Sequence, residues 1–170
     1  MRKVLVAFAV ALVALLAVCA GCTGTGDTAQ TGDSVSVSYT LYVDGEELQT
    51  NVGSTPLTFT LGSGQVVKGF DSAVLGMKIG ETKTVTVSPE LGYGNMTLNN
   101  QTTLTLSDAE SNLGKTLSEG DGFSVSASGV QYIANVLSID RANDTVLVAL
   151  NHYLAGKTLV FEITLLSINA

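Results

Sequence analysis

Apolar and polar residues alternate along the first part of the chain in short runs that are typical of half-buried β-strands. Segment 35–43 (VSVSYTLYV) places valine, tyrosine and leucine at every second position, which is the spacing of side chains on one face of a strand. Segment 57–61 alternates in the same way, and 82–87 is rich in threonine and valine, which favour strands. The final segment, 158–168, predicts a strand with too much apolar content for a sheet edge.

One stretch between these strands favours a helix instead. In segment 66–75 apolar residues recur at helical spacing, and Gly76 follows where a left-handed residue would end the helix. The Asp44-Gly45 pair is typical of a hairpin turn. Segment 46–55 between these elements is weakly patterned, so it predicts a loop or an irregular edge.

In the second half of the chain the apolar segments are shorter and are separated by more polar residues and glycine. Short apolar segments at 103–106, 123–125, 131–138 and 145–150 are separated by asparagine, aspartate, glycine and serine. Residues 136–139 and 146–150, joined by 140–144, are expected to pair as a hairpin. We therefore expect an α+β fold that is mostly β. Its antiparallel sheet would wrap on one short helix and would be interrupted by a small β-rich insert before the last core strand.

The N-terminal residues have the features of an export signal. A basic start precedes a charge-free apolar run from Val4 to Val18, which is short for a membrane span and suits a secretory signal. Residues 1–21 with Cys22 resemble a lipoprotein signal, in which Cys22 would follow the cleavage site and carry a lipid on its sulfur. A plain secretory signal and an uncleaved anchor remain open, and all three place the folded part outside the cytoplasm, facing or tethered to a membrane. The small, polar segment 22–32 predicts a flexible tether.

Cysteine use and charge exclude several classes of function. Both cysteines lie in the leader, so the folded part can hold no disulfide framework, redox pair or thiolate metal site. The chain has 15 acidic residues against 8 basic ones, and Arg2 and Lys3 of the latter belong to the leader. Such an acidic surface argues against nucleic acid as a partner and against electrostatic docking on anionic lipid. We therefore expect attachment to a membrane through the lipid alone.

Side chains for covalent or metal chemistry are scarce. The chain has a single histidine, His152, and lacks a GxSxG nucleophile motif and a histidine cluster, so we expect neither a metal nor a cofactor. The glycines at 62 and 64 are not followed by the lysine of a phosphate loop. Segment 56–94 instead places apolar and aromatic residues close to turns, where they can line a shallow pocket as easily as they can fill a core.

Four motifs carry a resemblance to a known family. They are VSVSYTLYVDG at 35–45, PLTFTLGSGQVVKGFDSAVLGMKIGE at 56–81, VSPELGYG at 87–94 and LAGKTLVFEITLLSI at 154–168. Together they resemble the FK506-binding-protein (FKBP) type of peptidyl-prolyl isomerase, and more closely its SlyD-like branch, in which a chaperone flap is inserted after the tyrosine-glycine motif. The resemblance implies an isomerase domain made of residues 33–94 and 151–170, with an inserted flap at 95–150.

The resemblance also implies a substrate site. Phe70 would be the pocket floor, and the Tyr93 hydroxyl would hydrogen-bond the substrate carbonyl. The family commonly carries Phe-Asp at the positions of Leu48 and Gln49 and an aromatic residue at Leu57, so we expect an activity that is reduced yet present. The full set implied to line the site is Tyr39, Leu48, Gln49, Leu57, Phe59, Val66, Val67, Phe70, Tyr93, Leu154 and Phe161. For Tyr39, Phe59 and Phe161, which lie on alternating strands, core packing remains an equal alternative.

The insert adds further expectations. By resemblance, some of its apolar residues stay exposed to grip unfolded chains, so the expected partners are unfolded or proline-containing polypeptides, and the protein is expected to be a monomer. His152 matches a turn residue of the family, with a structural role. Asn95, Asn100 and Asn143 begin N-glycosylation triplets. Two alternatives remain open, namely a catalytically weak peptide-binding module that uses the same groove and flap, and a surface domain with a decayed site.

Overall fold

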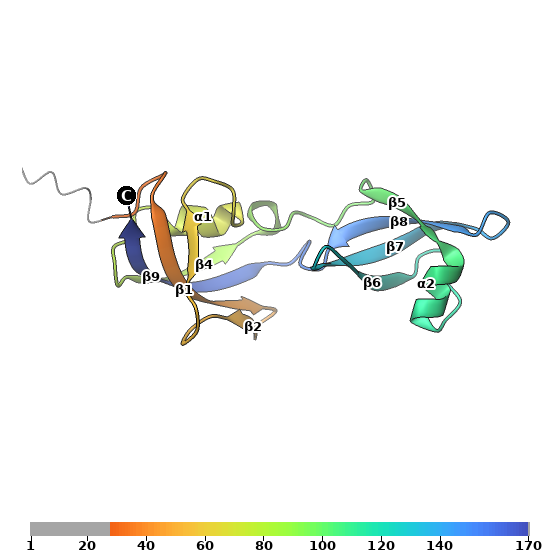
Figure 1. Ribbon diagram of the computed structural model, residues 1–170, viewed down its shortest axis with the longest axis horizontal. Helices are drawn as coiled ribbons and strands as arrows, with labels where there is room; N and C mark the ends of the chain where they lie inside the picture. Colours follow the sequence, from red (N-terminus) through yellow and green to blue (C-terminus); the bar gives the residue numbers. More distant parts are fainter. Residues whose placement is uncertain (1–27, 170) are drawn as a thin grey trace, which may run out of the picture.

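The computed structural model describes residues 28–169, which form two lobes, each built on its own sheet and its own core (Figure 1). The predicted signal at 1–21, Cys22 and the start of the predicted tether lie outside the described residues. In chain order the elements are β1 (Ser34–Val43), β2 (Glu46–Thr50), β3 (Leu57–Thr60), α1 (Lys68–Val74), β4 (Thr82–Val87), η1 (Pro89–Leu91), β5 (Gln101–Thr105), α2 (Leu106–Leu113), β6 (Gly122–Ala127), β7 (Val130–Asp140), β8 (Thr145–His152) and β9 (Leu159–Asn169). Among these residues no helix is long and apolar enough to cross a membrane.

The first lobe is a 5-stranded antiparallel sheet in the order β2-β1-β9-β4, with β3 pairing with β1 as well. Strand β9 lies between β1 and β4, and its alternating residues Leu159, Ile163 and Leu165 are fully buried. This agrees with the prediction that the last segment is too apolar for an edge. The mostly β, antiparallel α+β fold that the sequence predicts is confirmed.

Helix α1 lies against one face of this sheet and carries Phe70 into the core (Figure 1). It starts at Lys68, slightly inside the predicted segment, because Val67 has an extended backbone and forms the N-cap. Gly69 allows the close approach of α1 to β4, since a Cβ at this position would overlap the side chain of Val87. As predicted, Gly76 follows the helix with a left-handed φ of 80°.

The segment before β1 is part of the first lobe. Ala29 is fully buried, its amide donates to the Met77 carbonyl at 2.9 Å, and its carbonyl accepts from the Gly76 amide at 2.8 Å. The Gly32 amide donates to the Leu61 carbonyl at 3.0 Å. Residues 28–32 of the predicted tether are therefore bonded to the domain, and the rest of the predicted tether lies outside the described residues.

Strand β2 replaces the loop or irregular edge that the sequence predicts at its position. All five of its residues are exposed, so it carries no alternating pattern. Asn51 ends the strand and fixes it to β1, because its side-chain oxygen accepts from the Tyr39 amide at 2.6 Å and its side-chain nitrogen donates to the Val37 carbonyl at 3.2 Å.

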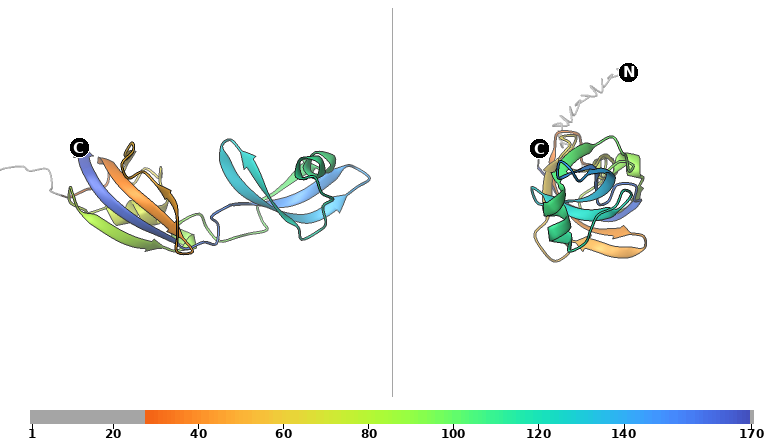
Figure 2. Two further views of the ribbon diagram at one scale, coloured as in Figure 1. Left: turned by 90° about the horizontal axis from the view of Figure 1, so that it is seen from below. Right: turned by 90° about the vertical axis from the view of Figure 1, so that its right-hand side faces the viewer.

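The second lobe is a 4-stranded antiparallel sheet in the order β5-β8-β7-β6, with α2 at one end (Figures 1 and 2). Helix α2 is an addition to the one helix that the sequence predicts. Of its residues only Leu106 is buried, and the Ser107 amide is capped by the carboxylate of Asp144 at 2.9 Å, from a turn far along the chain. A helix with one buried residue shows no repeating apolar pattern, and a cap from a distant turn is not visible in the neighbouring sequence.

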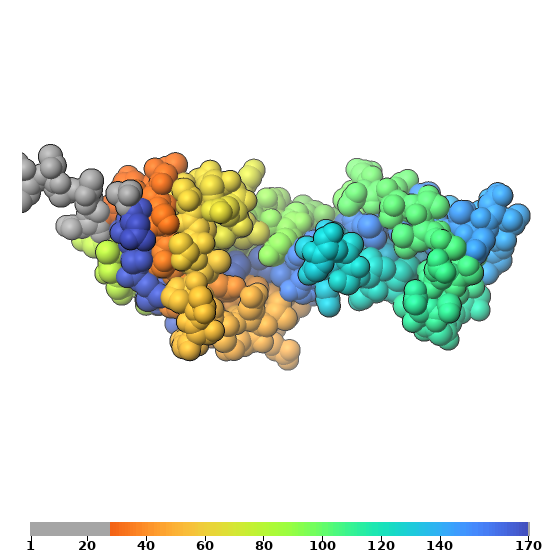
Figure 3. All heavy atoms as spheres, in the orientation of Figure 1, coloured from red at the N-terminus to blue at the C-terminus, as the bar shows by residue number. Residues whose placement is uncertain are grey.

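Two linkers connect the lobes and are bonded to each other. The Gly156 amide donates to the Gly94 carbonyl at 2.8 Å. The buried side chain of Asn151 accepts from the Thr97 amide at 2.7 Å and donates to the Thr97 carbonyl at 3.0 Å. Figure 2 shows both linkers passing side by side between the lobes, and Figure 3 shows the resulting elongated body.

Candidate functional site

A cavity of about 500 Å³ opens in the first lobe between the sheet, the loop after β3 and the start of α1. Its walls come from β1, β2, β3, β9, α1 and two loops, so the fold brings together residues that are far apart in the sequence. None of the residues that line it is charged. They are Tyr39, Leu41, Gln49, Leu57, Gly64, Gln65, Val66, Val67, Phe70, Tyr93 and Phe161.

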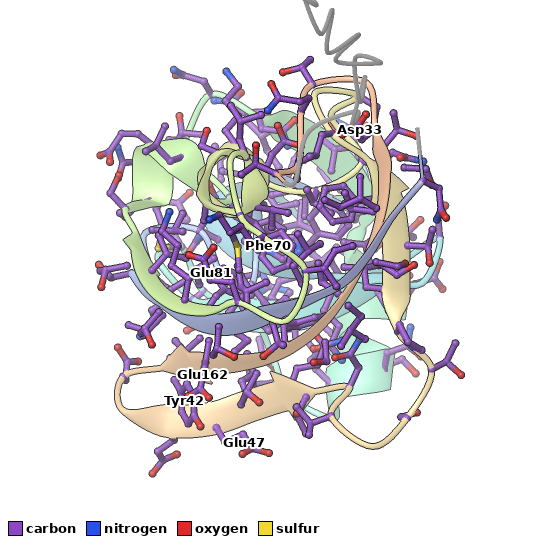
Figure 4. The ribbon with its side chains drawn as sticks, turned by 90° about the vertical axis from the view of Figure 1, so that its left-hand side faces the viewer. Asp33, Tyr42, Glu47, Phe70, Glu81 and Glu162 are labelled. Carbon is purple, nitrogen blue, oxygen red and sulfur yellow. The ribbon has the colours of Figure 1, made fainter. Side chains whose placement is uncertain are left out.

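Phe70 lies at the centre of an array of aromatic rings. Its ring meets Tyr39 edge to face, with centroids 5.6 Å apart and planes at 83°, and it meets Phe161 at 5.0 Å and 82°. Edge-to-face pairs of this kind are favourable and fix the relative orientation of the rings. Phe70 is only 3% exposed, and Figure 4 places it in the middle of the lobe. Phe70 is therefore both a core residue and a wall of the cavity.

The loop after β3 is held by side chains that bond its backbone. The Asp71 carboxylate accepts from the Gly62 amide at 3.0 Å, and the Gln65 side-chain oxygen accepts from the Thr60 amide at 2.8 Å. Gly62 and Gly64 both have left-handed backbones, which other residues adopt only with strain. These bonds fix the part of the loop that presents Val66 and Val67 to the cavity.

Tyr93 lies at the rim of the cavity, in the loop after η1. Its side chain is 41% exposed, and its ring stacks on His152 with centroids 3.8 Å apart and planes at 2°. Burial raises the pKa of Tyr93, and the neighbouring Tyr153 and Tyr39 raise it further. Burial also raises the pKa of Tyr39. Both phenols are therefore neutral near pH 7, and the Tyr93 hydroxyl is available as a hydrogen-bond donor.

Eight of the predicted site residues line this cavity, and three do not. Leu48 is 47% exposed, because neighbouring side chains of a strand point to opposite faces and Gln49 takes the face toward the cavity. Phe59 and Leu154 are 3% and 4% exposed and belong to the core. Phe59 touches the site indirectly, since its ring centroid lies 5.8 Å from that of Phe70.

Three lining residues were missed from the sequence: Leu41, Gly64 and Gln65. Leu41 could have been found, because the two-residue period places it on the same face of β1 as Tyr39. Gly64 and Gln65 carry no such signal, since their position depends on the path of a loop. Between Thr28 and Asn169, no three histidine, aspartate or glutamate side chains gather as a metal site would require.

The comparison with known proteins agrees with this geometry. A model of the FKBP-type peptidyl-prolyl cis-trans isomerase family matches residues 26–166. The chain belongs to this family. It is 34% identical over 146 residues to the short-type peptidyl-prolyl cis-trans isomerase of Methanocaldococcus jannaschii, and the match covers 78% of this chain and 88% of that protein.

Two fungal FKBPs match a shorter part of the chain. FK506-binding protein 2 of Aspergillus fumigatus is 47% identical over 66 residues, which is 37% of this chain and 49% of that protein. FK506-binding protein 1A of Neurospora crassa is 46% identical over 66 residues, covering 38% of this chain and 55% of that protein. The archaeal FKBP-type match is too long to be contained in the first lobe, so it also includes residues of the second.

Proposed function

We propose that the cavity of the first lobe binds the prolyl residue of a polypeptide and catalyses cis–trans isomerisation of the preceding peptide bond. The observation that carries the proposal is the aromatic array around Phe70 at the base of an uncharged cavity, with the Tyr93 hydroxyl at its rim. A rigid ring wall fits the flat, apolar face of a proline ring, and a neutral phenol fits the carbonyl beside it.

The chemistry requires no nucleophile. The barrier to rotation about a peptide bond is about 18–20 kcal/mol and comes from amide resonance. Because the twisted amide has less charge separation than the planar one, an apolar cavity favours the twisted form, and a wall that holds the ring lets the carbonyl turn. Binding groups that fit the twisted form better than the planar form therefore suffice to catalyse the reaction.

We expect the rate to be reduced by the residues at the rim. Gln49 stands where the resemblance implies an aspartate, and Leu57 where it implies an aromatic residue; both line the cavity. A neutral amide supplies no charged acceptor, and an aliphatic wall holds the ring less closely. Gln49→Asp and Leu57→Phe are thus expected to raise kcat/KM on proline tetrapeptides rather than to lower it.

The decisive experiment compares two buried rings of the same core. Phe70 and Phe59 are equally buried at 3% exposure, but only Phe70 lines the cavity. We expect Phe70→Leu to lower kcat/KM in a protease-coupled tetrapeptide assay much more than Phe59→Leu, while both variants lose similar free energy of unfolding. If the wild-type protein gives no acceleration at high enzyme concentration, isomerisation is excluded and only peptide binding remains.

A second activity is proposed for the insert, namely holding unfolded polypeptides. A groove of about 310 Å³ lies between α2 and the edge strands β5 and β6, and its walls include Leu104, Leu113, Phe123 and Val125. An exposed apolar groove beside an unpaired strand edge is suited to an extended apolar segment. Leu113→Asp should weaken suppression of aggregation of an unfolded protein and leave the tetrapeptide rate unchanged. Ser111→Asp, at an exposed position of α2 that does not line the groove, is the control for added charge.

Export and lipid attachment are also proposed, on the basis of the sequence. The basic start, the apolar run from Val4 to Val18 and the position of Cys22 support them. Membrane fractionation of Cys22→Ser and Cys19→Ser separates the possibilities. Release of Cys22→Ser alone indicates lipidation at Cys22, whereas retention of both variants favours an uncleaved anchor.

A further inference from the structure

His152 belongs to the second lobe by its backbone and to the site by its side chain. It is the last residue of β8, where it pairs with Tyr132 of β7. Its ring nevertheless stacks face to face on Tyr93, with centroids 3.8 Å apart. The contact therefore joins the end of the insert sheet to the rim of the cavity in the first lobe.

The imidazole is itself held in place. Its Nδ1 accepts a hydrogen bond from the Leu154 amide at 3.2 Å, and the Tyr132 ring meets it at 6.4 Å and 77°. The preceding residue, Asn151, is buried and bonded to both backbone groups of Thr97. Burial lowers the pKa of His152, which agrees with a neutral ring that accepts at Nδ1.

The Tyr93 ring has fewer constraints of its own. It is partly exposed, and its hydroxyl takes part in no hydrogen bond to another described residue. It lies between Gly92 and Gly94, and Gly94 has a left-handed φ of 78°. Of the aromatic contacts within the described part of the chain, the stack on His152 is the one that Tyr93 makes. The orientation of the phenol thus depends on this stack.

We propose that His152 is a positioning residue for Tyr93: by stacking on the phenol it aims the hydroxyl at the substrate carbonyl. This rests on the proposed role of the cavity in isomerisation. Because His152 ends a strand of the insert, the insert completes the catalytic site in addition to binding polypeptides. His152 itself touches no substrate and transfers no proton.

The test uses four variants of the full chain. His152→Ala removes the stack and should lower kcat/KM on a proline tetrapeptide by about two- to tenfold, the factor expected from one favourable aromatic pair. His152→Phe keeps a flat ring and should restore most of the activity. In a Tyr93→Leu background, His152→Ala should cause no further loss, because there is no phenol left to position.

A second measurement does not depend on activity. The face of a neighbouring ring shifts the NMR signals of Tyr93 ring protons upfield, so this shift should disappear in His152→Ala and persist in His152→Phe. Thermal unfolding of each variant shows whether the fold is intact.

The outcomes separate the two proposals. If Tyr93→Leu leaves the rate unchanged, the proposed role of Tyr93 is wrong, and so is the positioning role. If Tyr93→Leu lowers the rate but His152→Ala does not, or lowers it equally in both backgrounds, then only the positioning role is overturned.

Discussion

The two lobes each carry an apolar hollow, but they build it in different ways. In the first lobe the base of the cavity is formed by three aromatic rings, of Tyr39, Phe70 and Phe161, that meet edge to face, and Phe70 belongs to both the cavity and the core. In the second lobe the groove combines a single aromatic ring, that of Phe123, with aliphatic and polar side chains, and the largest fully buried side chains of the lobe are Leu117, Val146 and Val148. Rigid rings suit one ligand shape, whereas aliphatic side chains adapt to several. This difference agrees with the two proposed roles: the first lobe would bind the single shape of a proline ring, and the second would bind polypeptides of varied sequence.

The same comparison predicts different sensitivities to mutation. A buried residue shared by a site and a core, such as Phe70, cannot be changed without loss of stability, whereas a partly exposed groove residue such as Leu113 can be changed at a smaller cost. The largest effect should come from Phe70→Ala. Removing a buried phenylalanine usually costs about 3–5 kcal/mol, so we expect the first lobe to unfold at moderate denaturant and isomerase activity to be lost.

The second lobe should survive this change, because its core is separate. Amide signals of β7 and β8, followed by NMR in the Phe70→Ala variant, provide the measurement. Simultaneous loss of these signals would show that the lobes fold as one cooperative unit, which contradicts the picture of two independent cores.

A smaller effect is expected at the junction. Asn151→Ala leaves the amide and carbonyl of Thr97 without their side-chain partner, and unsatisfied groups of this kind cost about 1–3 kcal/mol. We expect a modest fall in the free energy of unfolding and a wider range of lobe orientations by small-angle scattering. Asn99→Ala, at an exposed position of the same linker, is the control and should change neither property.

Isomerase activity, which we assign to the first lobe, should depend on pH through the ionisation of Tyr93. The phenol of Tyr93 must be neutral to donate, and burial raises its pKa above the ordinary value of about 10. Isomerase activity should therefore persist to higher pH than an ordinary tyrosine would allow and fall only beyond it, whereas Tyr93→Phe should show a lower rate without this fall. A decline in wild-type activity already below pH 9, with the fold intact, would contradict the role of the phenol.

The smallest effect should come from the ion pair between the β1–β2 turn and the returning linker. Lys157 and Asp44 lie 2.7 Å apart, but their side chains are 47% and 68% exposed. Exposed pairs contribute at most about 1 kcal/mol. Lys157→Ala should thus shift the melting temperature little and leave kcat/KM unchanged, and a large loss would show that the pair helps to orient the lobes.

Sequence patterns predicted those parts of the fold that depend on local alternation. The strands β1 and β9, the helix α1 and the hairpin of β7 and β8 all bury one face, so their periods are visible. Strand β2 was missed because all its residues are exposed, and its position is fixed by Asn51, which follows it and bonds the backbone of β1. Helix α2 was missed because Asp144 caps it from a distant turn.

The residues of the candidate site could be predicted where they lie on positions of the family motifs. Residues on motif positions, such as Phe70 and Tyr93, line the cavity. The same resemblance also assigned Leu48 and Phe59 to the site, but the Leu48 side chain lies on the exposed face of β2 and Phe59 is buried in the core. The stack of Tyr93 on His152 joins a loop to the end of strand β8, which is distant in sequence, so no pattern along the chain could indicate it.

The docking of Ala29 against Gly76 and Met77 also bears on the proposed attachment to a membrane. The described chain begins at the end of the first lobe that faces away from the linkers, and the second lobe occupies the other end of the long axis (Figure 1). Any anchor placed ahead of Thr28 would hold the molecule by the end of the first lobe that faces away from the insert. The insert would then be the part with the longest reach, and it would meet a polypeptide before the cavity does.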